Sequence, residues 1–191
     1  MLNRRHIRIK VLQSLYSYLK ISEKDLTNSK KIFNDSLKNI ENLYLCLFVY
    51  VLGLRDYIDN ILENSKFKKL PSVQDLNPNT KFVDNRFLKL LQSLPSIKKA
   101  INDFSFLHNN SLYSDIYLNL LKLDDYQNYL NFKTDDFEQD KLFLTKIFSK
   151  FLIENEHFHY LLNEQNIFWD DDLPFISSMV VKTIKDSNSK K

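Results

Sequence analysis

Residues 33–61, FNDSLKNIENLYLCLFVYVLGLRDYIDNI, decide the fold of this 191-residue chain. Apolar side chains recur along this stretch in alternating steps of four and three residues, which is the spacing of one face of an α-helix. The matching positions are Phe33, Leu37, Ile40, Tyr44, Leu47, Val51, Leu54, Ile58 and Ile61. The pattern predicts one long helix over residues 26–64. Leu43, Phe48 and Leu52 widen the stripe, so we expect its middle to be buried on more than one side.

Helical spacing continues through most of the remaining chain, and no segment shows the clean two-residue alternation of a half-buried β-strand. Residues 65–80 contain Pro71 and Pro78 and are predicted to form a loop. Thr134 is expected to cap a helix that extends to about residue 152. Further helices are predicted at 5–20, 81–93, 96–107, 112–131, 156–165 and 173–185. The sequence therefore predicts one all-α domain over residues 1–191, a bundle of about seven to eight helices around one long central helix, with 187–191 as a disordered tail.

The composition excludes several classes of protein. The chain has one glycine, Gly53, which argues against phosphate-cradling loops and Rossmann turns. Its one cysteine, Cys46, lies in an apolar run and is expected to be a buried thiol rather than part of a disulfide framework. That run is too short to cross a bilayer, and the N-terminus lacks the apolar core of a secretory signal. We therefore expect a cytoplasmic protein with no membrane partner.

Arginine is concentrated at the N-terminus. Three of the five arginines are Arg4, Arg5 and Arg8, whereas the chain uses 22 lysines elsewhere for positive charge and has a net charge of +3. A guanidinium group binds phosphate bidentately and stacks on flat rings, which suits nucleic acid. Tyr16 lies at the edge of the apolar stripe of the first helix, where its ring could stack on a base. The alternative interpretation is a solvated N-terminal turn, although the helix dipole disfavours basic residues there.

Other polar groups give weaker signals of chemistry. His157 and His159 are two residues apart, so on a helix they point in nearly opposite directions and cannot share one metal ion. The run Asp170–Asp172 is expected to favour the start of the following helix rather than to form a carboxylate pair for catalysis. No Ser-His-Asp, Cys-His or glycine-rich arrangement is present in the sequence. We therefore expect no enzyme activity, cofactor, metal site or small-molecule substrate.

The stretch Arg4-Arg5-His6-Ile7-Arg8-Ile9-Lys10-Val11-Leu12-Gln13-Ser14-Leu15-Tyr16 resembles the opening of the NusB family of transcription antitermination factors. The family pattern is an arginine-rich start followed by a helix containing Gln-x-Leu-Tyr. More weakly, residues 137–184 resemble a family segment with a Phe/Leu-rich helix and a Trp near an acidic turn. The resemblance implies an all-helical fold and binding of single-stranded, boxA-like RNA during ribosomal RNA transcription. Under it, Arg4, Arg5, Arg8 and Tyr16 match the RNA-binding positions of the family. Lys10 is not part of the family pattern but is expected to add positive charge to the same RNA-binding site.

The same resemblance implies NusE, a ribosomal protein, and the transcription elongation complex as partners. The chain is similar to a longer form of the family, with residues 65–133 as a possible insertion. It is expected to lack the family's C-terminal helix pair, which contributes to the partner-binding surface, because it ends soon after the helix at 173–185. The alternative function is a helical protein–protein interaction module whose RNA site is decayed or incomplete, supported by the long apolar stripe over residues 33–61.

Overall fold

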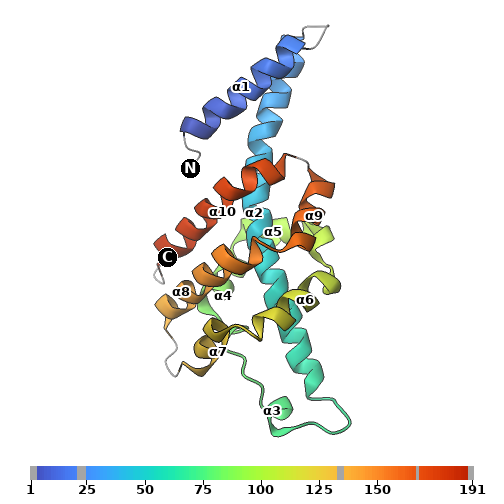
Figure 1. Ribbon diagram of the computed structural model, residues 1–191, viewed down its shortest axis with the longest axis vertical. Helices are drawn as coiled ribbons and strands as arrows, with labels where there is room; N and C mark the ends of the chain where they lie inside the picture. Colours follow the sequence, from blue (N-terminus) through green and yellow to red (C-terminus); the bar gives the residue numbers. More distant parts are fainter. Residues whose placement is uncertain (1–3, 21–24, 133–135, 167, 189–191) are drawn as a thin grey trace. The chain divides into compact units, whose positions relative to one another are not determined.

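The computed structural model describes residues 4–20, 25–132, 136–166 and 168–188, without the side chains of residues 150 and 151 (Figure 1). These residues form ten α-helices, a short 3-10 helix and a π-helical segment, and no strand is present among them. The all-α prediction is confirmed, and so is the long helix, α2 (Leu26–Ser65). The predicted cap Thr134 and residues 189–191 of the predicted tail lie outside the described residues.

The remaining elements follow the predicted order. They are α1 (Arg4–Lys20), α3 (Val73–Leu76), α4 (Arg86–Ser93), α5 (Pro95–Asp103), η1 (Ser105–Leu107), α6 (Asn110–Leu120), α7 (Asp124–Asn131), α8 (Phe137–Ile147), the π-helical η2 (Phe148–Leu152), α9 (Glu156–Gln165) and α10 (Trp169–Asp186). Two helices exceed the predicted eight. One is α3, in the predicted loop, and the other arises because the predicted helix 112–131 divides into α6 and α7.

Local hydrogen bonds explain the altered boundaries. The predicted helix at 81–93 begins only at Arg86, because the side chain of Asn85 accepts a hydrogen bond from the backbone N–H of Leu88 and caps α4. Ser72 and Asp75 form a capping box that starts α3. α10 begins four residues earlier than predicted, at Trp169, so that Asp170–Asp172 occupy its first turn. Acidic side chains are stabilising there because they interact with the positive end of the helix dipole.

Contacts divide the chain into two compact units, Met1–Leu43 and Tyr44–Lys191, and α2 contributes residues to both. The first unit contains α1 and the start of α2. There Asp25 caps α2 by accepting hydrogen bonds from the backbone N–H groups of Thr27, at 2.8 Å, and Asn28, at 3.2 Å. The described part of the predicted insertion 65–133, residues 65–132, belongs to the second unit, and its helices α4 and α7 contact α8.

The core of the second unit is built on α2. Cys46, Leu47, Tyr50 and Leu54 have no exposed surface. The ring of Tyr50 stacks on Phe158 of α9, with ring centroids 3.8 Å apart and nearly parallel planes. Consequently, the middle of α2 is enclosed on several sides, as its widened apolar stripe predicts.

A buried polar network joins α4, α7 and α8 in the second unit. The carboxylate of Asp140 accepts hydrogen bonds from the hydroxyl of Tyr129, at 2.6 Å, and from the backbone N–H of Arg86, at 2.8 Å. Asn85 donates to the Tyr129 hydroxyl at 3.2 Å. Burial and the adjacent Asp140 carboxylate raise the pKa of Tyr129. The network therefore satisfies polar groups that would otherwise be buried without partners.

The substitution Asp140→Ala is predicted to destabilise the second unit by about 2–3 kcal/mol, because the Arg86 N–H loses its acceptor and the Tyr129 hydroxyl keeps only the longer contact to the Lys81 carbonyl, at 3.3 Å. Urea unfolding followed by circular dichroism would measure this change. Asp84→Ala is the matched control, since Asp84 pairs with Lys89 at the surface and its loss should change stability by less than about 0.5 kcal/mol. Equal effects for the two variants would contradict the assigned role of Asp140.

The chain's only glycine, Gly53, allows the hydroxyl of Tyr113 to approach the backbone of α2. A Cβ atom added at Gly53 would lie 2.1 Å from the Tyr113 hydroxyl oxygen and 2.5 Å from its Cζ atom. Glycine in a helix interior costs about 1 kcal/mol relative to alanine. The close packing of the Tyr113 ring, from α6, against this turn of α2 therefore explains why residue 53 is glycine.

Gly53→Ala is accordingly predicted to destabilise the protein by a net 1–2 kcal/mol or so, because steric overlap with Tyr113 exceeds the gain in helix propensity. Denaturant unfolding would measure the effect. In a Tyr113→Ala background the same change should instead stabilise the protein by up to about 1 kcal/mol. A stabilising effect of Gly53→Ala in the otherwise unchanged protein would show that Tyr113 does not constrain this turn.

Candidate nucleic-acid interface

The three predicted RNA-binding arginines lie on α1 with exposed side chains. Arg4, Arg5 and Arg8 lie within the first five positions of this helix, and its first turn carries no acidic residue. Arg4 and Arg8 are one turn apart and therefore share a side of the helix, with Arg5 beside them. The structure thus brings the arginines together in an exposed group at one end of α1.

The same side of α1 continues into an aromatic and aliphatic surface. Tyr16 is 64% exposed, and the Lys20 ammonium lies 5.5 Å from the centre of its ring. Leu12, Leu15 and Leu19 are also exposed, Leu12 by 69%. We call the outer face of α1 the surface formed by Arg4, Arg5, Arg8, Leu12, Leu15, Tyr16 and Leu19.

This orientation reverses the one that the apolar stripe of α1 suggests. The stripe Ile9, Leu12, Tyr16 and Leu19 is exposed, whereas Lys10 is only 5% exposed. Lys10 lies six residues after Arg4, which places it on the opposite side of the helix from the outer face. The long aliphatic stem of lysine makes such burial possible. The structure therefore groups Tyr16 with the arginines on one face and separates Lys10 from them.

The other residues weighed in the sequence do not assemble a reactive site. No group of three or more metal-ligating side chains occurs among the residues that the structure describes. Both ring nitrogens of His159 are engaged, Nδ1 with the Asp170 carboxylate at 2.9 Å and Nε2 with the Ile153 carbonyl at 2.7 Å. Cys46 is a buried free thiol, as predicted, and burial raises its pKa. These residues have structural surroundings rather than those of a nucleophile or metal ligand.

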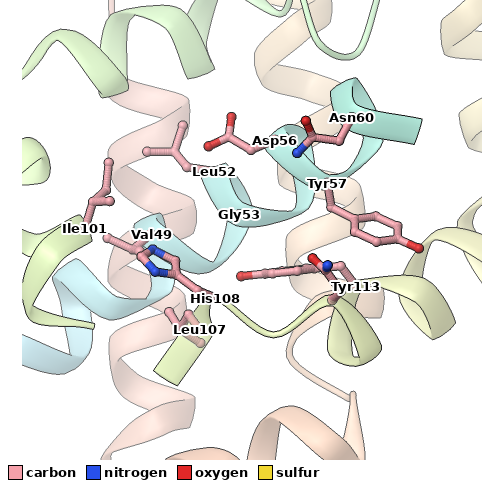
Figure 2. Close-up of a pocket in the computed structure, with 11 residues that line it drawn as sticks. Val49, Leu52, Gly53, Asp56, Tyr57, Asn60, Ile101, Leu107, His108 and Tyr113 are labelled. Atoms are coloured by element: carbon pink, nitrogen blue, oxygen red, sulfur yellow. The ribbon is translucent and has the colours of Figure 1, made fainter. Parts of the chain in front are cut away.

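A cavity of about 160 Å³ beside Gly53 is the feature that sequence reasoning missed (Figure 2). Its lining combines apolar residues of α2 with polar side chains that include Asp56, Asn60, His108 and Tyr113. The one available sequence signal was a lone glycine inside an uninterrupted helical pattern, since such a glycine often marks close backbone approach. His108, Asn110 and Tyr113 could not be assigned to this cavity from the sequence, because they meet α2 only in the folded chain.

Comparisons of the chain with protein-family models, with curated proteins and with solved structures found no match. None of the described helices combines the length and the apolar character needed to span a bilayer.

Proposed function

We propose that this protein is a NusB-like transcription antitermination factor that binds single-stranded, boxA-like RNA through the outer face of α1. The observation that carries the proposal is the exposed group Arg4, Arg5 and Arg8 followed, on the same face, by the exposed ring of Tyr16. Lys10 is not part of the proposed surface, because its side chain is buried.

The chemistry of this face suits single-stranded RNA. Guanidinium groups neutralise and bind phosphate oxygens, while the unstacked bases of a single strand can stack on an aromatic ring or a guanidinium plane. Residues 4–20 contain five basic residues, Arg4, Arg5, Arg8, Lys10 and Lys20, and no acidic residue, which favours attraction of a polyanion to this helix. The proposed role is to hold RNA for the transcription machinery, with NusE as a proposed partner, and it needs no catalytic group.

A second candidate function is a helical protein–protein interaction module. The exposed side chains of Leu12, Leu15 and Leu19 favour it, because aliphatic side chains at this spacing are typical of a helix that packs against another helix. Titration of labelled boxA RNA against a scrambled RNA distinguishes the two candidates. An RNA factor prefers boxA, whereas a protein-interaction module binds both RNAs weakly and equally.

Combined substitution of Arg4 and Arg8 by alanine is expected to weaken boxA RNA binding by about tenfold or more. If each arginine neutralises one phosphate, the slope of log K against log salt concentration should fall by about 1.4. Fluorescence anisotropy at several salt concentrations would measure both effects, and circular dichroism would verify folding.

The matched control for this variant is Lys98→Ala with Lys99→Ala, which removes the same charge from exposed positions of α5. We expect the control to keep nearly the original affinity. An equal loss in both double variants would indicate a general charge effect, and binding that does not respond to salt would contradict the proposed phosphate contacts.

Tyr16→Ala is expected to reduce RNA affinity by about tenfold through loss of a stacking surface, whereas Tyr16→Phe should retain most of the affinity because the ring remains. Tyr16 is largely exposed, so both variants should fold normally. The same anisotropy titration would compare them. Equal affinities of the alanine and phenylalanine variants would argue against base stacking at this position.

A further inference from the structure

The cavity beside Gly53 lies entirely within the second unit, between α2 and residues 101–113. Figure 2 shows Tyr113 beneath the Gly53 turn with its hydroxyl directed toward that turn, and Asp56 and Asn60 projecting from the following turns of α2. The remaining wall includes Val49, Leu52, Ile101 and Leu107. An apolar wall with a few polar groups is the usual construction of a ligand site.

Tyr113 is the most informative residue of this cavity. The residue is 3% exposed, and its hydroxyl is buried without a hydrogen-bond partner. Burial raises the pKa of Tyr113, so the hydroxyl remains neutral and can both donate and accept a hydrogen bond. An unsatisfied buried hydroxyl is costly, and the chain places its only glycine where this hydroxyl approaches α2. A ligand that forms a hydrogen bond with the Tyr113 hydroxyl would remove this free-energy cost.

Further hydrogen-bonding groups lie at the exposed edge of the same space. The side chains of Asn60, His108 and Asn110 line the cavity, belong to exposed residues and form no hydrogen bond with any other part of the described chain, so a ligand can reach them. Asp56 is different, because its carboxylate receives the Nε–H of the buried Arg55 at 2.9 Å and forms an ion pair with that guanidinium. The one acidic group at the cavity is thus matched by an adjacent cation.

These properties define the class of ligand. Because the carboxylate of Asp56 is already paired, the cavity favours an uncharged molecule over one that brings its own charge. The asparagine amides each offer a donor and an acceptor, which match a molecule with carbonyl and N–H groups along its edge. A volume of about 160 Å³ is close to the engineered cavity of roughly 150 Å³ that holds one benzene ring. A single polar ring therefore matches the volume and the polar groups of this cavity.

We propose that this cavity binds a pyrimidine base, either in a free nucleoside or in a single-stranded nucleic acid, with the Tyr113 hydroxyl hydrogen-bonded to the edge of the ring. Asn60 and Asn110 then contact the remaining edge groups, and the apolar wall covers one face of the ring. This site is separate from the outer face of α1, so the proposal does not depend on RNA binding there.

The single glycine makes the proposal directly testable. Selective labelling of the full chain with [¹⁵N]glycine gives one backbone amide signal, that of Gly53 in the wall of the cavity. Addition of uridine or cytidine is expected to shift this signal saturably, with a Kd of roughly 0.1–10 mM for so small a ligand. Adenosine, whose base has two fused rings, and benzene, which has no polar edge, should shift it less.

Tyr113→Phe removes only the hydroxyl and should weaken nucleoside binding about five- to tenfold, because one hydrogen bond is lost. Tyr126→Phe is the matched control, since Tyr126 is a buried tyrosine of α7 outside the cavity lining, and it should leave affinity unchanged. Asn60→Leu provides a second test at an exposed position, where folding is not at risk, and should also weaken binding.

A short pyrimidine oligonucleotide distinguishes the two sources of the ligand. A Gly53 shift with nucleosides supports a free nucleoside, and a shift with the oligonucleotide alone that Tyr113→Phe weakens supports a base within a strand. Three results would overturn the proposal: no shift with any pyrimidine, equal shifts with benzene or adenosine, or unchanged binding in Tyr113→Phe.

Discussion

The burial of α2 in the second unit is the constraint on which the rest of that unit depends. A helix whose middle residues have no exposed surface must be covered on several sides, and residues far apart in the sequence supply the cover. Phe158 of α9 stacks on Tyr50, Tyr113 of α6 meets Gly53, and the hydroxyl groups of Tyr44 and Thr183 of α10 are 2.7 Å apart. The fold is thus organised by what α2 must bury.

Two buried tyrosine hydroxyls in this unit have opposite surroundings. The hydroxyl of Tyr129 donates to Asp140 and receives a hydrogen bond from Asn85, so its burial is compensated within the chain. The hydroxyl of Tyr113 has no such partner, and neither has that of Tyr50, but of these two residues only Tyr113 lines the Gly53 cavity. Because unpaired buried polar groups are costly, the first arrangement is explained by stability, and the position of Tyr113 at the cavity is the basis of the proposed ligand.

The proposed functions use different kinds of surface. The outer face of α1 is open, basic and aromatic, which suits a flexible polyanion that is held by charge and stacking. The Gly53 cavity is small and partly open to solvent, and its one carboxylate, that of Asp56, is paired with Arg55, which suits one uncharged ring. The exposed leucines on the outer face of α1 also suit a helical protein partner, which is the alternative proposal for that face.

Much of the secondary structure could be predicted from the sequence. The nine apolar positions over Phe33–Ile61 predicted α2, because the spacing of apolar residues along a helix is visible in the sequence itself. The division of residues 112–131 into α6 and α7 was not predictable, since neither glycine nor proline marks the break. For the candidate interface, the sequence identified Arg4, Arg5, Arg8 and Tyr16 as chemically suited to RNA.

The exposed side of α1 follows from its packing and not from its sequence pattern. Periodicity shows that Ile9, Leu12, Tyr16 and Leu19 share a face, but a single helix does not reveal which face its neighbours cover. Contacts outside that pattern bury Lys10 and leave the leucines and Tyr16 in solvent. The Gly53 cavity likewise required the tertiary structure, because α2 and Tyr113 meet only when residues 60 positions apart are packed together. Periodicity and residue chemistry thus specify α2 and the basic, aromatic character of α1, whereas contacts between distant residues set which face of each helix remains accessible.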